Sequence, residues 1–121
     1  MSQQKVKDGY LALNAQNWSA VQALLDPDVI FHVEGREADY VGRPAVIAFL
    51  KELVADVGGG NKIRFLTVTT DGTGADKRQV SVDRTTIDVR GQSVDHICAD
   101  SFRFENNLIV EGWICHVDHL S

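Results

Sequence analysis

One aspartate stands out because the residues that alternate with it along the chain are mostly apolar. Over residues 93–105, the alternation of a β-strand places one set of side chains on a common face, namely Val94, His96, Cys98, Asp100, Phe102 and Phe104. This set is more apolar than the other, so we expect it to face the interior and Asp100 to lie on a pocket wall. Burial disfavours the charged form of a carboxyl group, and a protonated acid can donate a hydrogen bond to a developing oxyanion. The alternative is an aspartate that pairs with an arginine or with backbone amides for structural reasons.

Two histidines could supply a base beside Asp100. His96 shares the expected inner face, but four residues of strand separate the two by roughly 13 Å, so they could only flank a common ligand. The simpler interpretation of His96 is a histidine at the rim of the sheet. His116 could form an acid–base pair with Asp100, because histidine titrates near neutral pH. The alternative for His116 is a rim or interface position.

The facing of the last expected strand, residues 108–119, depends on its register. Counting straight through the Asn106-Asn107 turn points Trp113 inward. A β-bulge would shift the facing by one residue, which would turn Ile114 and His116 inward and Trp113 outward. The residues alone leave both registers open.

The sequence contains no pattern that predicts a metal ion or a cofactor. His116 and His119 are three residues apart on an expected strand, so they face opposite sides of it. The glycines at 58–60 follow a helix rather than a strand, unlike those of a dinucleotide-binding loop. We therefore expect neither group.

Length and charge narrow the class of protein. The 121 residues suit a single domain over residues 1–121, and the net charge of −5 argues against nucleic acid and mildly against an anionic membrane surface. There is neither a membrane-length apolar run nor an N-terminal signal peptide, so we expect a cytoplasmic protein. Cys98 and Cys115 are then expected as reduced thiols, with a disulfide between neighbouring strands as the alternative.

Helices and strands must position these residues. Apolar residues at helical spacing predict helices over 5–15 and 18–25, and another from Pro44 to the glycines at 58–60. Runs rich in β-branched and aromatic residues predict strands over 29–33, 62–70, 77–89, 93–105 and 108–119. A polar loop is expected over 34–43. Segregated helices and strands indicate an α+β fold with helices on one face of a strongly twisted antiparallel sheet.

Four segments, in this order, resemble the nuclear-transport-factor-two-like superfamily, in particular its SnoaL-like and ketosteroid-isomerase branches. They are ALNAQNW at 12–18, FHVEG at 31–35, GRPAV at 42–46 and DSFRF at 100–104. The resemblance implies a cone-shaped α+β barrel, cystatin-like, with three N-terminal helices on a strongly curved, mixed but mainly antiparallel sheet. It also implies an internal pocket and often a homodimer. It does not select one activity, because members include isomerases, dehydratases, cyclases, epoxide hydrolases and proteins without catalysis.

The resemblance matches Asp100 to the acid that ketosteroid isomerases place at an oxyanion. The general base of those isomerases would fall at Val33, which cannot take a proton, and their oxyanion tyrosine would fall at Gly9, one residue from Tyr10. A steroid-type isomerase is therefore not expected. The residues of the epoxide-hydrolase branch are absent at the corresponding positions, which are near Phe31, Val33, Asp83, Thr85 and Ile114.

The same resemblance predicts which side chains of two strands point to the interior. Asp83 and Thr85 match inward positions of their strand, and Arg84 between them is expected to point outward. Relatives often carry a bulge in the last strand, which favours the register with His116 inward.

These observations support three functions. The first is a cofactor-free isomerase, dehydratase or cyclase that acts on a small, largely apolar carbonyl compound, with Asp100 as acid or oxyanion partner and His116 or His96 as base. Its pocket would be lined by Tyr10, Trp18, Phe31, Val33, Phe49, Asp83, Thr85, Cys98, Phe102, Phe104 and Ile114. The second is a binding module without catalysis, suggested by Val33. The third is a homodimer formed by the outer sheet face through Ile97, Ala99, Trp113 and Val117.

Overall fold

The computed structural model describes residues 2–57, 62–70, 79–93 and 97–115. Its helices are α1 (Ser2–Asn14), α2 (Trp18–Ala23) and α3 (Arg43–Val57). Its strands are β1 (Leu25–Val33), β2 (Tyr40–Val41), β3 (Lys62–Thr70), β4 (Val80–Ile87), β5 (Cys98–Glu105) and β6 (Leu108–Ile114).

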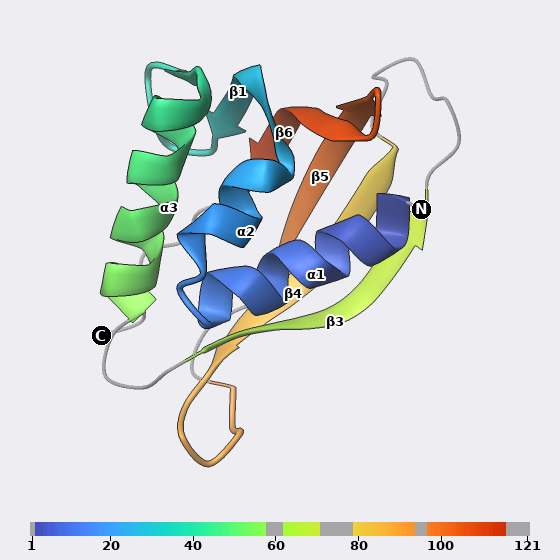
Figure 1. The fold of residues 1–121 in the computed structure, drawn as a ribbon. Coiled ribbons are helices and arrows are strands. Elements are labelled where there is room, and N and C mark those ends of the chain that lie inside the picture. Colours follow the sequence, from blue (N-terminus) through green and yellow to red (C-terminus); the bar gives the residue numbers. More distant parts are fainter. Residues whose placement is uncertain (1, 58–61, 71–78, 94–96, 116–121) are drawn as a thin grey trace.

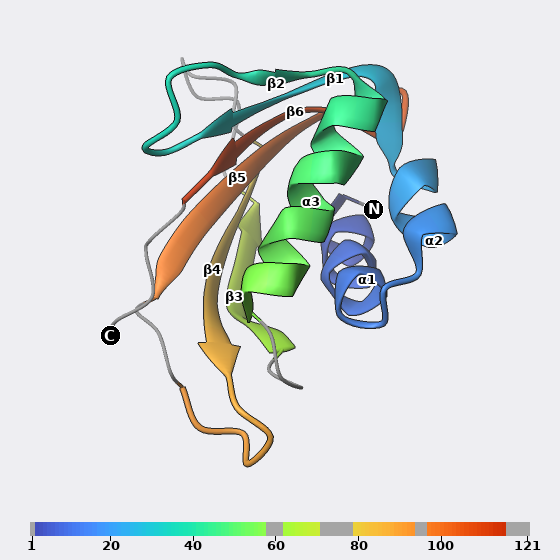
Figure 2. The same ribbon diagram turned by 90° about the vertical axis from the view of Figure 1, so that its left-hand side faces the viewer.

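The six strands form one mixed sheet in the order β2-β1-β6-β5-β4-β3. β1 runs parallel to β6, and the other neighbouring strands are antiparallel. The sheet curls around the helices but does not close, because β2 and β3 remain as its edges (Figures 1 and 2). All three helices lie on the concave face, and in the described part of the chain no helix covers the other face (Figure 2). The α+β class and the curved, mainly antiparallel sheet are confirmed.

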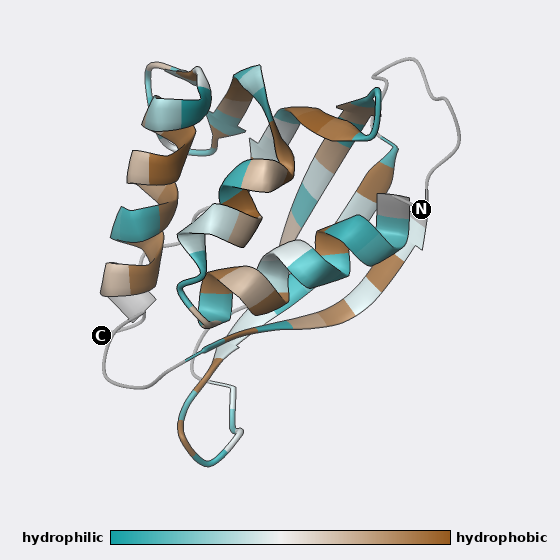
Figure 3. Ribbon diagram, in the orientation of Figure 1, coloured by the Kyte–Doolittle hydropathy of each residue, from teal (hydrophilic) through white to brown (hydrophobic). Residues whose placement is uncertain are grey.

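Local sequence explains where two helices begin. The Asn17 side chain caps α2 by accepting a hydrogen bond of 3.3 Å from the Ala20 backbone N–H. Pro44 is the second residue of α3, where its missing N–H would have no intrahelical partner anyway. Val46 and Phe49 of α3 are buried in the core. Figure 3 shows the brown, apolar side of this helix turned toward the other helices.

The strands differ from expectation at several places. β4 ends at Ile87 rather than at residue 89, and the described residues 93 and 97 lie outside β5 although a strand over 93–105 was expected. β1 begins at Leu25 rather than at Val29, and Pro27 lies within it. The pairing of β1 with β6 changes register before Ile30, and such an irregularity tolerates a proline that has no N–H for the ladder. The expected loop at 34–43 contains β2, an edge strand of two residues that is too short to leave an alternating pattern.

The core fills the space between the helices and the concave face. Its most deeply buried apolar side chains are Val29, Val46, Phe49, Val80 and Val82. Thr85 and Asp100 are buried to the same degree although they are polar. None of the described helices combines the length and the apolar character that a membrane crossing requires.

Candidate functional site

A small cavity lies between the helices and the concave face of the sheet. Its volume is about 60 Å³, so it suits a small occupant of a few non-hydrogen atoms. Most of its lining is apolar and consists of Val6, Gly9, Leu13, Val21, Leu24, Leu25, Phe31, Leu50, Leu53, Phe102, Ile109 and Ile114. The remaining lining residues are Tyr10, Arg84 and Asp100.

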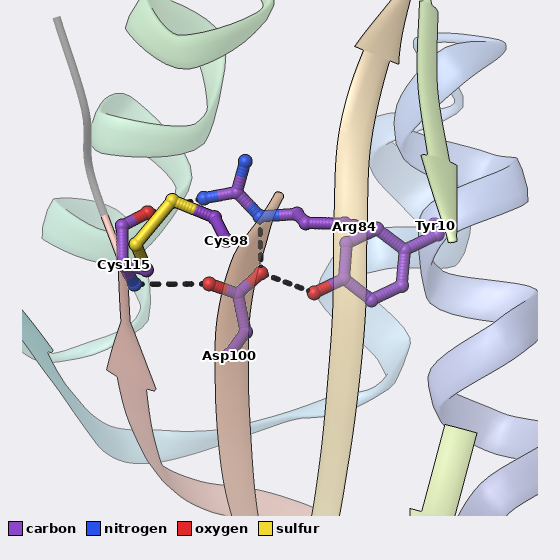
Figure 4. The surroundings of a disulfide bond; sticks show 5 residues. All are labelled: Tyr10, Arg84, Cys98, Asp100 and Cys115. Carbon is purple, nitrogen blue, oxygen red and sulfur yellow. Dashed lines mark hydrogen bonds and ion pairs between the residues drawn. A yellow bond between two sulfur atoms is a disulfide. The ribbon is translucent and has the colours of Figure 1, made fainter. Parts of the chain in front are cut away.

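Asp100, on β5, is 2% exposed and accepts three hydrogen bonds. Its Oδ2 accepts from the Tyr10 hydroxyl at 2.5 Å and from the Nε–H of Arg84, with which it also forms an ion pair. Its Oδ1 accepts from the backbone N–H of Cys115 at 3.0 Å (Figure 4). Three donors, one of them a cation, suit an ionised carboxylate. These contacts match the alternative of an aspartate paired with an arginine and a backbone amide, but the pair lies on the cavity wall.

Tyr10 reaches this cluster from α1 and is also buried. Burial raises the pKa of its hydroxyl well above 10.0, and the negative charge of Asp100 raises it further, against the opposite influence of Arg84. The hydroxyl therefore stays protonated and donates a hydrogen bond at neutral pH.

Arg84 is the polar residue of the cavity that the sequence reasoning missed. It is 7% exposed, donates from Nε to Asp100, and donates from Nη2 to the carbonyl oxygen of Cys115 (Figure 4). In the pairing of β4 with β5, Arg84 lies opposite Cys98, and Val82 lies opposite Asp100. Arg84 and Asp100 are thus diagonal neighbours across two strands, which long side chains can span.

The facing expected for β4 was therefore wrong. Asp83 is exposed, and Thr85 is buried but does not line the cavity. Because side chains alternate along a strand, an offset of one residue in the alignment with relatives exchanges the two faces. The sequence did contain a signal that Arg84 points inward. Residues 80, 82 and 84 lie on the same face of the strand, and two of them are the apolar Val80 and Val82, which are buried.

Cys98 and Cys115 form a disulfide, so the expected reduced thiols are corrected (Figure 4). Their Cα atoms lie 5.5 Å apart, within the usual range for this bond. Cys98 is the first residue of β5, and Cys115 directly follows the last residue of β6. The contact depends on how these two strands pair, which the spacing of the cysteines does not reveal.

The bulged register of the last strand is confirmed. The pairing of β5 with β6 shifts partway along both strands, so Ile114 is buried on the cavity wall and Trp113 is half-buried on the opposite face. His116 lies outside the described residues, as does His96, and both remain predictions.

Gly112 has no room for a side chain. It lies opposite Phe31 in the parallel pairing of β1 with β6. A Cβ atom at Gly112 would lie 2.7 Å from Cε1 and 2.8 Å from Cδ1 of the Phe31 ring. Glycine here allows the Phe31 ring to cover the strand and form part of the cavity wall.

The other residues expected at the pocket are divided between the wall and the core. Phe31 and Phe102 line the cavity. Four others are buried but do not line it, namely Val33, Phe49, Cys98 and Phe104. Trp18 is half-buried, with the Lys51 Nζ 5.5 Å from its ring centroid. Apolar wall and apolar core look alike in sequence, because packing decides where space is left.

A second polar cluster lies on the face of β1 that points away from the cavity. His32 contacts Asp39 through Nδ1 at 3.0 Å and Glu111 through Nε2 at 2.5 Å, and its ring stacks on Trp113. Burial alone would lower the pKa of His32, but the hydrogen bonds and charges of Glu111 and Asp39 outweigh it and raise the pKa above 6.5. Burial alone would raise the pKa of Glu111, but His32 and Arg103 lower it below 4.5. A ring with a carboxylate at each nitrogen acts as a structural link rather than as a base.

Several solved structures share this fold. Bal32a, from a soil-derived mobile gene cassette, has a TM-score of 0.73 and 26% identity, covering 91% of this chain and 84% of that one. A candidate polyketide cyclase of Sinorhizobium meliloti has a TM-score of 0.67 and 19% identity, covering 92% of this chain and 93% of that one. A candidate ketosteroid isomerase of Kribbella flavida has a TM-score of 0.71 and 15% identity, covering 99% of this chain and 80% of that one. Other similar structures are described as NTF2-like or cystatin-like.

No curated protein matches the chain. The family model of the SnoaL-like domain matches residues 6–112. This span includes α2, α3 and most of α1, and it contains Tyr10, Arg84 and Asp100. The resemblance noted from the sequence is thus confirmed, and the chain belongs to the SnoaL-like domain family, with an NTF2-like fold.

Proposed function

We propose that the chain binds a small, largely apolar molecule whose single carbonyl-type oxygen faces Tyr10, Arg84 and Asp100. The observation that carries this proposal is the buried ion pair of Arg84 and Asp100 on the wall of an otherwise apolar cavity. Apolar pockets with a few convergent polar groups are typical ligand sites. An apolar pair of similar size would often stabilise the fold at least as well as a buried ion pair. A role toward a ligand gives the ion pair a reason to be there.

Each polar residue has its own role in this proposal. The neutral Tyr10 hydroxyl turns from Asp100 to the ligand oxygen and donates a hydrogen bond to it. The Arg84 guanidinium provides positive charge where negative charge develops when a carbonyl compound enolises. Asp100 holds both donors in position. The activity would be that of a cofactor-free isomerase, dehydratase or cyclase, and the descriptions of the Sinorhizobium and Kribbella proteins support this class through the shared fold.

Binding without catalysis is the second candidate, and one observation favours it. Asp100 is the one carboxylate among the described residues that line the cavity, and three donors already occupy its oxygens. A carboxylate with its lone pairs engaged is poorly placed to remove a proton from a ligand. Catalysis would then need a base from His116 or His96.

Titration of the nitrogen-15-labelled protein, followed by NMR, tests the binding proposal. The probes are 2-butanone and 2-methyl-1-butene, in which a CH2 group replaces the carbonyl oxygen. We expect the ketone to bind more tightly and to shift the amide resonances of Phe102 and Cys115. Tyr10→Phe should weaken ketone binding about tenfold, the equivalent of one hydrogen bond, and leave the hydrocarbon unaffected. The control is Tyr40→Phe, because Tyr40 is half-buried but does not line the cavity.

Equal affinity for the two probes would reject the carbonyl part of the proposal, and the absence of any binding would reject the cavity as a ligand site. Exchange of the ketone's α-hydrogens in deuterium oxide separates the two candidates. Catalysed enolisation replaces those hydrogens with deuterium faster than buffer alone does. Binding without such exchange would leave the non-catalytic candidate.

Two further expectations stay predictions. One is a homodimer through the outer sheet face, and light scattering in solution measures it. The other is a cytoplasmic location, which cell fractionation measures. The disulfide counts against that location, because such bonds are rare in the cytosol.

A further inference from the structure

Both backbone polar groups of one residue, Cys115, meet the buried ion pair. The Cys115 backbone N–H donates to Oδ1 of Asp100 at 3.0 Å, and the Cys115 carbonyl oxygen accepts from Nη2 of Arg84. In Figure 4 the backbone of Cys115 lies directly beside the carboxylate, with the disulfide next to it. The Cys115 backbone therefore binds both members of the ion pair that lies on the cavity wall.

The disulfide ties this backbone to the strand that carries Asp100. Cys115 follows the end of β6, and the pairing of β6 with β5 runs only as far as Trp113 opposite Ser101. The bond joins Cys115 to Cys98 at the start of β5, and Cys98 in turn lies opposite Arg84 on β4. One covalent link thus fixes the Cys115 backbone relative to both members of the ion pair.

We propose that the Cys98–Cys115 disulfide is a redox-sensitive positioning bond, which holds the Cys115 backbone on the Asp100–Arg84 pair and thereby sets the affinity of the cavity for its ligand. The part that concerns ligand affinity rests on the proposed function. Cys98 and Cys115 do not themselves line the cavity, so they influence ligand affinity through the Asp100–Arg84 pair.

Reduction would follow ordinary thiol–disulfide exchange with a dithiol. Cys115 is half-buried and Cys98 is 4% exposed, so the reductant's thiolate attacks the Cys115 sulfur. A mixed disulfide forms there, and the Cys98 thiolate leaves and takes up a proton. The second thiol of the reductant then closes its own disulfide, and the Cys115 thiolate leaves and takes up a proton. Two electrons and two protons pass from the dithiol to the protein.

The released Cys115 backbone would no longer be held against the ion pair. The Asp100 Oδ1 would lose a donor and Arg84 would lose an acceptor, and buried polar groups without partners are strongly unfavourable. The carboxylate and the guanidinium would therefore rearrange at the cavity wall.

Amide hydrogen exchange of the full chain, with and without dithiothreitol, tests this inference. Mass spectrometry after alkylation confirms no free thiol before reduction and two after it. We expect exchange of the Cys115 amide to rise at least tenfold on reduction. The Ile109 amide serves as the internal control, because it lies near the other end of β6 and donates to the Leu24 carbonyl oxygen at 2.8 Å. Its exchange should change less than threefold, and the affinity for 2-butanone should fall at least fivefold.

The double variant Cys98→Ala/Cys115→Ala should reproduce the reduced state and show no response to dithiothreitol. Val46→Ala is the matched control for stability, because it truncates a buried side chain that does not line the cavity, and it should leave the Cys115 resonance in place. Equal increases at Cys115 and Ile109, or unfolding on reduction, would show that the bond only stabilises the whole fold and would overturn the inference. Two free thiols in the protein before reduction would also overturn it. If neither redox state binds 2-butanone, the proposed function fails, while the exchange at Cys115 still decides whether the bond positions the backbone.

Discussion

Replacement of Asp100 by asparagine probes the buried ion pair with almost no change of shape. Donors approach both carboxylate oxygens, namely the Cys115 N–H at Oδ1 and the Tyr10 and Arg84 groups at Oδ2. An asparagine amide presents an NH2 group at one of these positions. Whichever way it turns, that NH2 group meets a donor, and Arg84 loses its ion pair with Asp100.

The expected loss of stability follows from the burial of both partners. Arg84 is 7% exposed and Asp100 is 2% exposed, so water cannot replace the missing charge. Removing one member of a buried pair costs about 3–5 kcal/mol. Such a loss is a large part of the stability of a domain of this size.

Unfolding in urea, without reductant so that the disulfide stays intact, measures this effect. Asp83→Asn is the matched control, because Asp83 lies on the same strand as Arg84 and is exposed. It should change the free energy of unfolding by less than about 0.5 kcal/mol. The double variant Arg84→Met/Asp100→Leu should be more stable than Asp100→Asn, because it removes both charges of the buried pair rather than one.

The reasoning is refuted if Asp100→Asn unfolds within about 1 kcal/mol of the wild type, since a loss that small is ordinary for a hydrogen bond between neutral groups. It is also refuted if the double variant is no more stable than the single one. Either result would mean that water reaches the pair or that the two charges are not coupled.

Two further predictions concern the sheet. Gly112→Ala should lower the free energy of unfolding by about 1–3 kcal/mol, because the new Cβ would clash with the buried Phe31 ring, and a urea curve that matches the wild type would contradict this close approach. The raised pKa of His32 means that its contribution is present in full below about pH 6.5 and is lost as the pH rises through the folded-state value. The difference in unfolding free energy between wild type and His32→Gln should therefore be larger at about pH 5.5 than at about pH 8.5. It should stay below about 1 kcal/mol because the side chain is 34% exposed, and a difference independent of pH would contradict the ion pairs to Asp39 and Glu111.

The sequence by itself determined the order of the helices and long strands, and which face of β5 is buried. Asp100 and Phe102 lie on the cavity wall, and Cys98 and Phe104 are buried with them. These features are local, because capping residues, helical spacing and strand alternation act over a few neighbouring residues. They could be read without knowing which strands are neighbours.

Only the tertiary structure decided what surrounds Asp100. The register of β4 against β5 turned Arg84 inward, and the bulge between β5 and β6 placed the Cys115 backbone on the carboxylate. A shift of one residue in either pairing would exchange the faces and remove these contacts. Pairing between strands far apart in the chain depends on the packing of the whole sheet against its helices. For that reason the acid was found from sequence, whereas the sequence left an arginine partner and the disulfide only as alternatives and did not identify Arg84.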